Sequence, residues 1–185
     1  MRLQTSRFIL RSFEEKDCEP VTNYLSDWAV IGPLVMPPYP FHHKHALDFF
    51  KKMRAAEVAG RQEAFVIADP QTDDFLGVVG IHPEPSEKSN EKVCKLGYWL
   101  GAPYWRQGIM QEVLPPILKL AFADLGYDRM VAFTNTDNER SINVLRTAGF
   151  TYLGLIPSPP EETRGTPQST SWELMPAMLD LRKAV

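Results

Sequence analysis

Residues 96–113 read LGYWLGAPYWRQGIMQEV and predict a strand, a glycine-containing turn and the start of a helix. The strand is Leu96–Leu100, and the turn runs from Gly101 to Gly108. Such a turn presents free backbone N–H groups and the positive end of the helix dipole, which suit a phosphate or pyrophosphate. The spacing is neither that of a nucleoside-triphosphate loop nor that of a dinucleotide fingerprint, and an ordinary tight connection has the same appearance.

Strands and helices are expected on both sides of this stretch. Apolar periodicity predicts helices at 14–28, 43–59, 108–125 and 139–148. Strand patterns cover 5–11, 64–68, 75–81, 92–100, 130–133, 150–156 and 171–175. Runs of strands with separated helices indicate a mixed α/β sheet rather than a helical bundle or a β-sandwich.

Length and composition limit the class of protein. The 185 residues predict a single domain over 1–185. A net charge of −3 argues against a general nucleic-acid binder, and two cysteines cannot build a disulfide framework. We find neither a signal peptide nor an apolar run long enough for a membrane span. The sequence therefore predicts a cytoplasmic protein with no nucleic-acid or membrane partner.

Four sequence motifs, in the same order along the chain, resemble the motifs of one family. Residues 5–11, TSRFILR, look like an opening strand T-x-R-L-x-L-R, and residues 96–100 look like I-G-Y-W-L. Residues 105–113, WRQGIMQEV, look like a phosphate loop W-G-K-G-Y-A-T-E-A. The last signature, N-x-x-S followed by a helix and G-F, is matched by Asn138, Ser141, Gly149 and Phe150. Together they resemble the GNAT superfamily of N-acetyltransferases, and within it the branch that acetylates the N-termini of ribosomal proteins.

The resemblance implies an α/β (α+β) fold with a mixed, mostly antiparallel sheet of about seven strands, splayed central strands and flanking helices. Acetyl-CoA is the implied cosubstrate, with pantetheine beside the 98–100 strand and pyrophosphate on the amides of 106–110. Met110 stands where the family has Gly or Ala, and we expect binding to survive this change. The implied coenzyme contacts are Tyr98, Trp99, Leu100, Arg106, Gln107, Gly108, Ile109, Met110, Asn138 and Ser141.

The implied reaction is direct attack of a neutral amine on the thioester, without a covalent enzyme intermediate. The family pattern places Ser141 near the sulfur, where a hydroxyl can protonate the departing thiolate. No general base is evident. His82 is the tentative candidate, and a surface histidine is the alternative interpretation.

The acceptor is predicted to be the N-terminal α-amine of a protein or peptide. An α-amine with a pKa of ~7.7–8.0 is partly neutral near pH 7, whereas a lysine amine at ~10.4 is mostly protonated. A small-molecule amine (amino acid, polyamine or aminoglycoside) and a noncatalytic acyl-CoA-binding module are the alternatives. The acceptor cleft is expected to be walled by Tyr39, Phe41, Tyr98, Trp99 and the loop 158–168, although such aromatics equally fit a core.

We expect no metal site, because the spacing of the histidines at 42, 43 and 45 does not match a zinc site. The expected assembly is a monomer or a homodimer.

Overall fold

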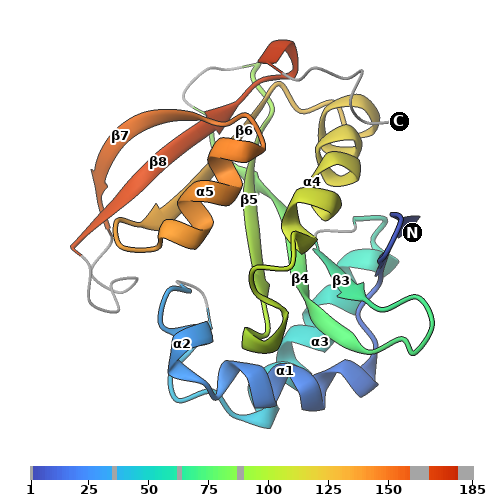
Figure 1. Ribbon diagram of the computed structural model, residues 1–185. Coiled ribbons are helices and arrows are strands. Elements are labelled where there is room, and N and C mark those ends of the chain that lie inside the picture. The colour runs from blue at the N-terminus through green and yellow to red at the C-terminus, as the bar shows by residue number, and fades with distance from the viewer. Residues whose placement is uncertain (1, 35–36, 62–63, 87–89, 159–166, 179–185) are drawn as a thin grey trace. The chain divides into compact units, whose positions relative to one another are not determined.

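A computed structural model describes residues 2–34, 37–61, 64–86, 90–158 and 167–178. It contains one sheet of eight strands in the order β1-β2-β3-β4-β5-β6-β8-β7, with flanking helices (Figure 1). Strands β5 and β6 run parallel, and the pairs β1–β2, β2–β3, β3–β4, β6–β8 and β7–β8 run antiparallel. The predicted mixed, mostly antiparallel α/β sheet is therefore confirmed, with eight strands in place of about seven.

The chain divides into two compact units, and strands β4 (Phe75–Glu84) and β5 (Val93–Leu100) run through both of them. The first unit comprises residues 1–80 and 98–109. Its other strands are β1 (Leu3–Gln4), β2 (Ile9–Arg11) and β3 (Ala64–Ala68). Its helices are η1 (Glu15–Asp17), α1 (Cys18–Leu25), α2 (Trp28–Ile31), α3 (His43–Val58) and η2 (Ala102–Tyr104).

The N-terminal part of the first unit differs from the sequence prediction in two places. The predicted strand at 5–11 is a turn from Thr5 to Phe8 followed by the short strand β2, which pairs back on β1. This hairpin supplies the additional strand. The predicted helix at 14–28 stops at Leu25, because the Asp27 carboxylate accepts the Ala29 N–H and starts a separate helix, α2.

The core of the first unit lies between strands β2, β3 and β4 and helices α1 and α3. Strand β3 is buried along its whole length. Phe13 packs edge-on against Phe49 and Phe75, with ring centroids 5.3 and 6.3 Å away. Helix α3 ends where predicted, and Gly60, with a φ of 75°, follows its C-terminus.

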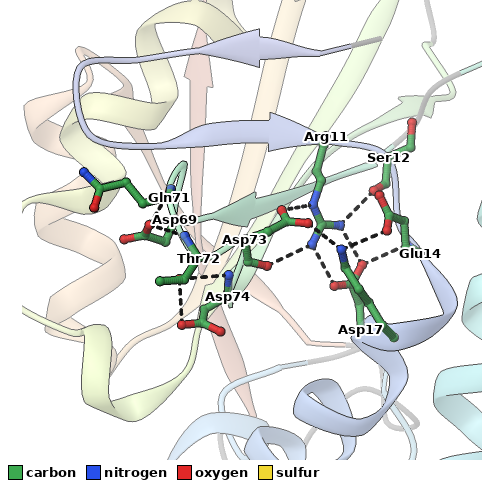
Figure 2. Close-up of polar contacts among 10 residues, drawn as sticks. Arg11, Ser12, Glu14, Asp17, Asp69, Gln71, Thr72, Asp73 and Asp74 are labelled. Carbon is green, nitrogen blue, oxygen red and sulfur yellow. Dashed lines mark hydrogen bonds and ion pairs between the residues drawn. The ribbon is translucent and has the colours of Figure 1, made fainter.

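An ion-pair network, buried at Arg11 and Asp17, joins β2 to η1 and to the β3–β4 turn (Figure 2). The Arg11 guanidinium donates to both oxygens of Asp17 at 2.8 and 2.9 Å, and its Nε donates to Asp73 at 2.7 Å. Lys16 binds the other oxygen of Asp73. Burial alone would lower the pKa of Arg11, but the hydrogen bonds to Asp17 and Asp73 outweigh it and raise that pKa. Arg11 therefore remains charged in the interior.

The second unit comprises residues 81–97 and 110–185. Helix α4 (Ile109–Lys119) continues through two prolines, Pro115 and Pro116, and ends in a π-helical turn, η3 (Leu120–Asp124). Strand β6 (Arg129–Asn135), helix α5 (Glu139–Thr147) and strands β7 (Thr151–Pro157) and β8 (Gln168–Leu174) follow, and the short helix η5 (Pro176–Met178) lies after β8. In the ranges that the structure describes, no helix combines the length and the apolar character that crossing a membrane requires.

Candidate active site

The end of β5 lies very close to β4 in the first unit. A Cβ atom on Gly77 would overlap the Trp99 carbonyl oxygen and lie 2.9 Å from the Leu100 Cα. The Gly101 N–H donates to the Leu76 carbonyl at 2.9 Å just beyond. Only a residue without a side chain allows this approach, so Gly77 sets the position of the strand 98–100. Tyr98, Trp99 and Leu100 are each half-buried there.

The turn after β5 is held to the strand by an indole. Trp105 Nε1 donates to the Leu100 carbonyl at 2.9 Å, and the Gln107 side-chain amide donates to the Pro103 carbonyl at 2.8 Å. Arg106 and Gly108 both have left-handed backbones, with φ of 61° and 71°. The chain therefore turns sharply before α4 begins at Ile109.

The outer surface of this turn is made of exposed residues, Arg106, Gln107 and Gly108. Ile109 and Met110 are 2% and 4% exposed, so their side chains lie in the core. The Met110 side chain therefore does not occupy the exposed side of the turn, although it is larger than the Gly or Ala of the family pattern. The turn leads into an eleven-residue helix, whose first N–H groups have no partner within the helix.

Asn138 and Ser141 belong to the second unit, where Asn138 is the N-cap of α5. Its side-chain oxygen accepts the Ser141 N–H at 3.2 Å, as expected for a residue that starts a helix. Ser141 is half-buried in the first turn of that helix. Asn138 therefore caps α5, and its role toward the coenzyme stays a prediction.

His82 lies on β4 in the second unit and faces the glycine of the next strand. Its Nε2 would lie 3.8 Å from a Cβ atom on Gly97, an ordinary contact distance, so the ring lies next to β5 at this position. The position before the LGYW strand holds Lys95, which forms an ion pair with Glu84 at 3.4 Å. His82 is half-buried, and its role as a base stays a prediction.

Of the four aromatic residues predicted for the acceptor cleft, Tyr98 and Trp99 are half-buried on β5, and the other two differ in exposure. Tyr39 is 57% exposed and packs edge-on against Trp28 at 4.9 Å. Phe41 is 8% exposed and belongs to the core of the first unit, with its ring against His45. Residues 159–166 of the loop 158–168 lie outside the described residues.

Neither cysteine has the properties of a nucleophile. Cys94 is fully buried on β5, and burial raises the pKa of its thiol to about 12. Burial also raises the pKa of Cys18. The reactive form of a thiol is the thiolate, so both side chains are inert near neutral pH. Within the described ranges, no group of three or more histidine, cysteine or acidic side chains could hold a metal ion.

Two residues of the first unit escaped the sequence prediction. The guanidinium of Arg7 binds the Gln107 carbonyl in the turn before α4, and Gly77 admits the backbone of β5. The contact of Arg7 could not be predicted, because the pattern of residues 5–11 predicts a strand rather than a turn. The place of Arg7 in the T-x-R pattern was the available signal. Gly77 gave no signal, because its partner strand lies more than twenty residues further along the chain.

Comparison with known proteins agrees with this arrangement of strand, turn and helix. An N-acetyltransferase of Bacillus licheniformis named p20, itself uncharacterized, is 26% identical over 154 residues, 83% of this chain and 84% of that protein. A GNAT-family acetyltransferase from Bacillus anthracis superimposes with a TM-score of 0.79 at 20% identity, covering 95% of this chain and 98% of that one. The ribosomal-protein α-N-acetyltransferase RimL, solved in complex with coenzyme A, gives a TM-score of 0.77 at 18% identity, covering 95% and 98%.

A family model described as an acetyltransferase (GNAT) domain matches residues 7–151, which include the strand 96–100, the turn before α4 and the Asn138 cap. The match covers most of the chain. The protein therefore belongs to the GNAT family of acetyltransferases.

Proposed function

We propose that this acetyltransferase moves the acetyl group of acetyl-CoA to the N-terminal α-amine of a protein or peptide. The observation that carries the proposal is the turn 105–108, where an exposed backbone with two left-handed residues leads directly into helix α4. A turn of this kind favours phosphate groups through its backbone N–H donors and the helix dipole.

The pyrophosphate is proposed to bind the amides of residues 106–110, and pantetheine to run beside Tyr98, Trp99 and Leu100. The buried Met110 side chain supports the first assignment, because it leaves the exposed side of the turn clear. Arg106 is exposed at the turn and is a further phosphate contact in this proposal. RimL, whose structure holds coenzyme A, supports the choice of coenzyme.

In the proposed reaction the amine nitrogen attacks the thioester carbonyl, a C–N bond forms and the C–S bond breaks. A backbone N–H near Trp99 or Leu100 would stabilise the oxyanion. Ser141 is proposed to give a proton to the departing thiolate, and His82 or water to take the proton that the amine loses. Asn138, which holds the first turn of α5, is proposed to orient Ser141 and to contact pantetheine.

An α-amine is the favoured acceptor for two reasons. Its pKa of ~7.7–8.0 leaves part of it neutral near pH 7 without a strong base, and the position before the LGYW strand holds Lys95 rather than an acid. RimL, a structural neighbour, is described as acting on the α-amine of a ribosomal protein.

Calorimetric titration with acetyl-CoA tests the coenzyme first, and we expect saturable binding at micromolar concentration. A thiol-release assay then compares short peptides with free N-termini against the same peptides with blocked N-termini, and against amino acids, polyamines and aminoglycosides. Turnover confined to free N-termini supports the proposal. If only small amines are turned over, the proposal of an α-amine acceptor is wrong. If acetyl-CoA does not bind, the whole proposed function is wrong.

Substitutions test the proposed roles of Ser141 as the general acid and His82 as the general base. Ser141→Ala is expected to lower kcat by roughly 100-fold, within the range that a positioned general acid contributes. Ser26→Ala, which removes a hydroxyl at the end of α1, is the matched control and should leave kcat unchanged. If turnover survives both Ser141→Ala and His82→Ala, these two roles are wrong, although the transferase assignment stands.

A further inference from the structure

The turn between β1 and β2 carries an arginine at its tip. The Thr5 hydroxyl accepts the Phe8 N–H at 3.0 Å, and the Thr5 N–H donates to the Phe8 carbonyl at 2.9 Å. These two bonds close the turn and leave Arg7 exposed on it, with its guanidinium carbon 4.9 Å from the centroid of the Phe8 ring. Thr5 and Phe8 therefore hold the backbone on both sides of Arg7.

The Arg7 guanidinium reaches the turn before α4, which lies in the same unit. Its Nη1 and Nη2 each donate to the Gln107 carbonyl oxygen at 3.2 Å. The side chain of Gln107 is held at the same time by the Pro103 carbonyl, at 2.8 Å. Gln107 is thus held at its carbonyl and at its side-chain amide.

This contact fixes the direction of a backbone donor. In a planar trans peptide unit the carbonyl and the following N–H point in opposite directions. When Arg7 holds the Gln107 carbonyl, the Gly108 N–H must point away from Arg7. Gly108 has a φ of 71° and lacks a Cβ atom, so in the absence of this contact its peptide would have more freedom to rotate than most others.

We infer that Arg7 is a positioning residue for acetyl-CoA: by holding the Gln107 carbonyl, it aims the Gly108 N–H at the pyrophosphate. The inference rests on the proposed function, which places the pyrophosphate on this turn. The guanidinium also polarises the peptide unit that it binds, and this strengthens the N–H at the other end as a donor. Its permanent positive charge adds attraction for the phosphates. Arg7 needs no contact with the coenzyme for either effect.

The test compares two acetyl donors that differ in their phosphates. S-acetyl-N-acetylcysteamine has the thioester and part of the pantetheine arm but no phosphate. With Arg7→Ala we expect KM for acetyl-CoA to rise roughly fivefold to tenfold with kcat little changed, the size of one lost hydrogen bond of ordinary net strength. The kcat/KM for S-acetyl-N-acetylcysteamine should stay at the wild-type value. Arg7→Lys keeps the positive charge but loses the planar guanidinium with its two N–H donors to the Gln107 carbonyl. Its KM for acetyl-CoA should therefore lie between those of the wild type and Arg7→Ala.

Arg54→Ala is the control for net charge, because Arg54 lies on α3 in the same unit and forms an i,i+3 ion pair with Glu57 on that helix. It should leave KM for both donors unchanged. Thermal unfolding of each variant separates folding from binding. If Arg7→Ala does not fold, the Arg7→Lys and Arg7→Gln variants carry the test, and a failure of all three to fold would make Arg7 a stability residue and overturn the inference.

Two further results separate this inference from the proposed function. If the wild-type protein does not bind acetyl-CoA, the proposed function fails, and the inference fails with it. If the wild-type protein binds acetyl-CoA and Arg7→Ala binds it equally well, only the inference is overturned. Equal losses with both donors would likewise overturn it, because a general structural defect acts on both.

Discussion

At the scale of single residues, Arg11 illustrates how a charge is kept in the interior of this protein. Its side chain is 8% exposed and that of Asp17 is 2% exposed, so both have lost nearly all contact with water. Two parallel N–H···O bonds to Asp17, together with the bond from Nε to Asp73, replace that hydration (Figure 2). Removing one partner leaves the other charge buried and incompletely paired.

We therefore predict that Asp17→Asn lowers the free energy of unfolding by about 3 kcal/mol. The substitution keeps the shape of the side chain but removes the charge that faces Arg11. Urea denaturation followed by circular dichroism measures the difference. Asp48→Asn, on an exposed position of α3, is the control and should change the free energy of unfolding by less than ~0.5 kcal/mol. Equal effects at the two positions would contradict the buried-pair interpretation.

At the scale of elements, the contact between β4 and the end of β5 depends on a missing side chain. Gly77 faces the backbone of Trp99 and Leu100, and a backbone cannot move aside as a flexible side chain can. On the other side, a Cβ atom on Gly101 would lie 2.9 Å from the Tyr24 ring. The strand proposed to bind pantetheine is thus placed by two glycines.

Gly77→Ala is predicted to destabilise the protein by ~1–3 kcal/mol, the usual cost of forcing a methyl group into a packed region. It should also weaken acetyl-CoA binding, because the strand 98–100 must shift. Gly97→Ala is the matched control on β5, since its Cβ atom would meet only His82 at an ordinary contact distance of 3.8 Å. Thermal unfolding and calorimetry measure both properties. A Gly77→Ala protein as stable as Gly97→Ala would show that β5 is not held by this contact.

At the scale of the whole molecule, stability is expected to fall at low pH. Burial alone would raise the pKa of Asp73, but hydrogen bonds from Lys16 and Arg11 lower it below its ordinary value. A carboxylate with a lowered folded-state pKa contributes stability above its unfolded pKa of ~3.9, and that contribution is lost as the pH falls through the folded pKa. Asp73 is 39% exposed, so solvent screening keeps its contribution small. Urea midpoints between pH 7 and pH 3 should fall less steeply for Asp73→Asn than for the wild type, and identical slopes would contradict this.

High pH is expected to destabilise the protein, because it ionises a thiol and a phenol whose burial favours the neutral form. Burial raises the pKa of Cys94 to about 12, and burial with a hydrogen bond to Tyr104 raises that of Tyr24 to about 12. A raised folded-state pKa contributes stability below the unfolded pKa, ~8.5 for cysteine, and that contribution disappears as the pH rises through the folded pKa. Cys94→Ala should therefore unfold at a urea midpoint that depends less on pH between about 8.5 and 11. An unchanged alkaline dependence would show that Cys94 does not cause it.

Local patterns predicted the elements that depend on neighbours in the chain. Helix α3 with Gly60 after it, helix α5 with its Asn138 cap and Gly149, and strand β3 all lie where apolar periodicity and end residues place them. The first thirty residues were harder to predict. The side-chain cap of Asp27 divides one expected helix into two, and the Thr5 hydroxyl turns part of an expected strand into a hairpin.

The sequence alone determined the family and the order of the strands and helices along the chain. The four motifs made this possible, because they consist of periodic apolar residues, helix caps and turn residues, whose effects extend over only a few positions. The tertiary structure decided which side chains from distant segments meet. Arg7 reaches Gln107 across one hundred positions of sequence, Arg11 reaches Asp73 across sixty-two, and Gly77 receives the backbone of Trp99. The burial of Met110 was decided in the same way. Such contacts depend on where folding brings two segments together, and no local propensity encodes that position.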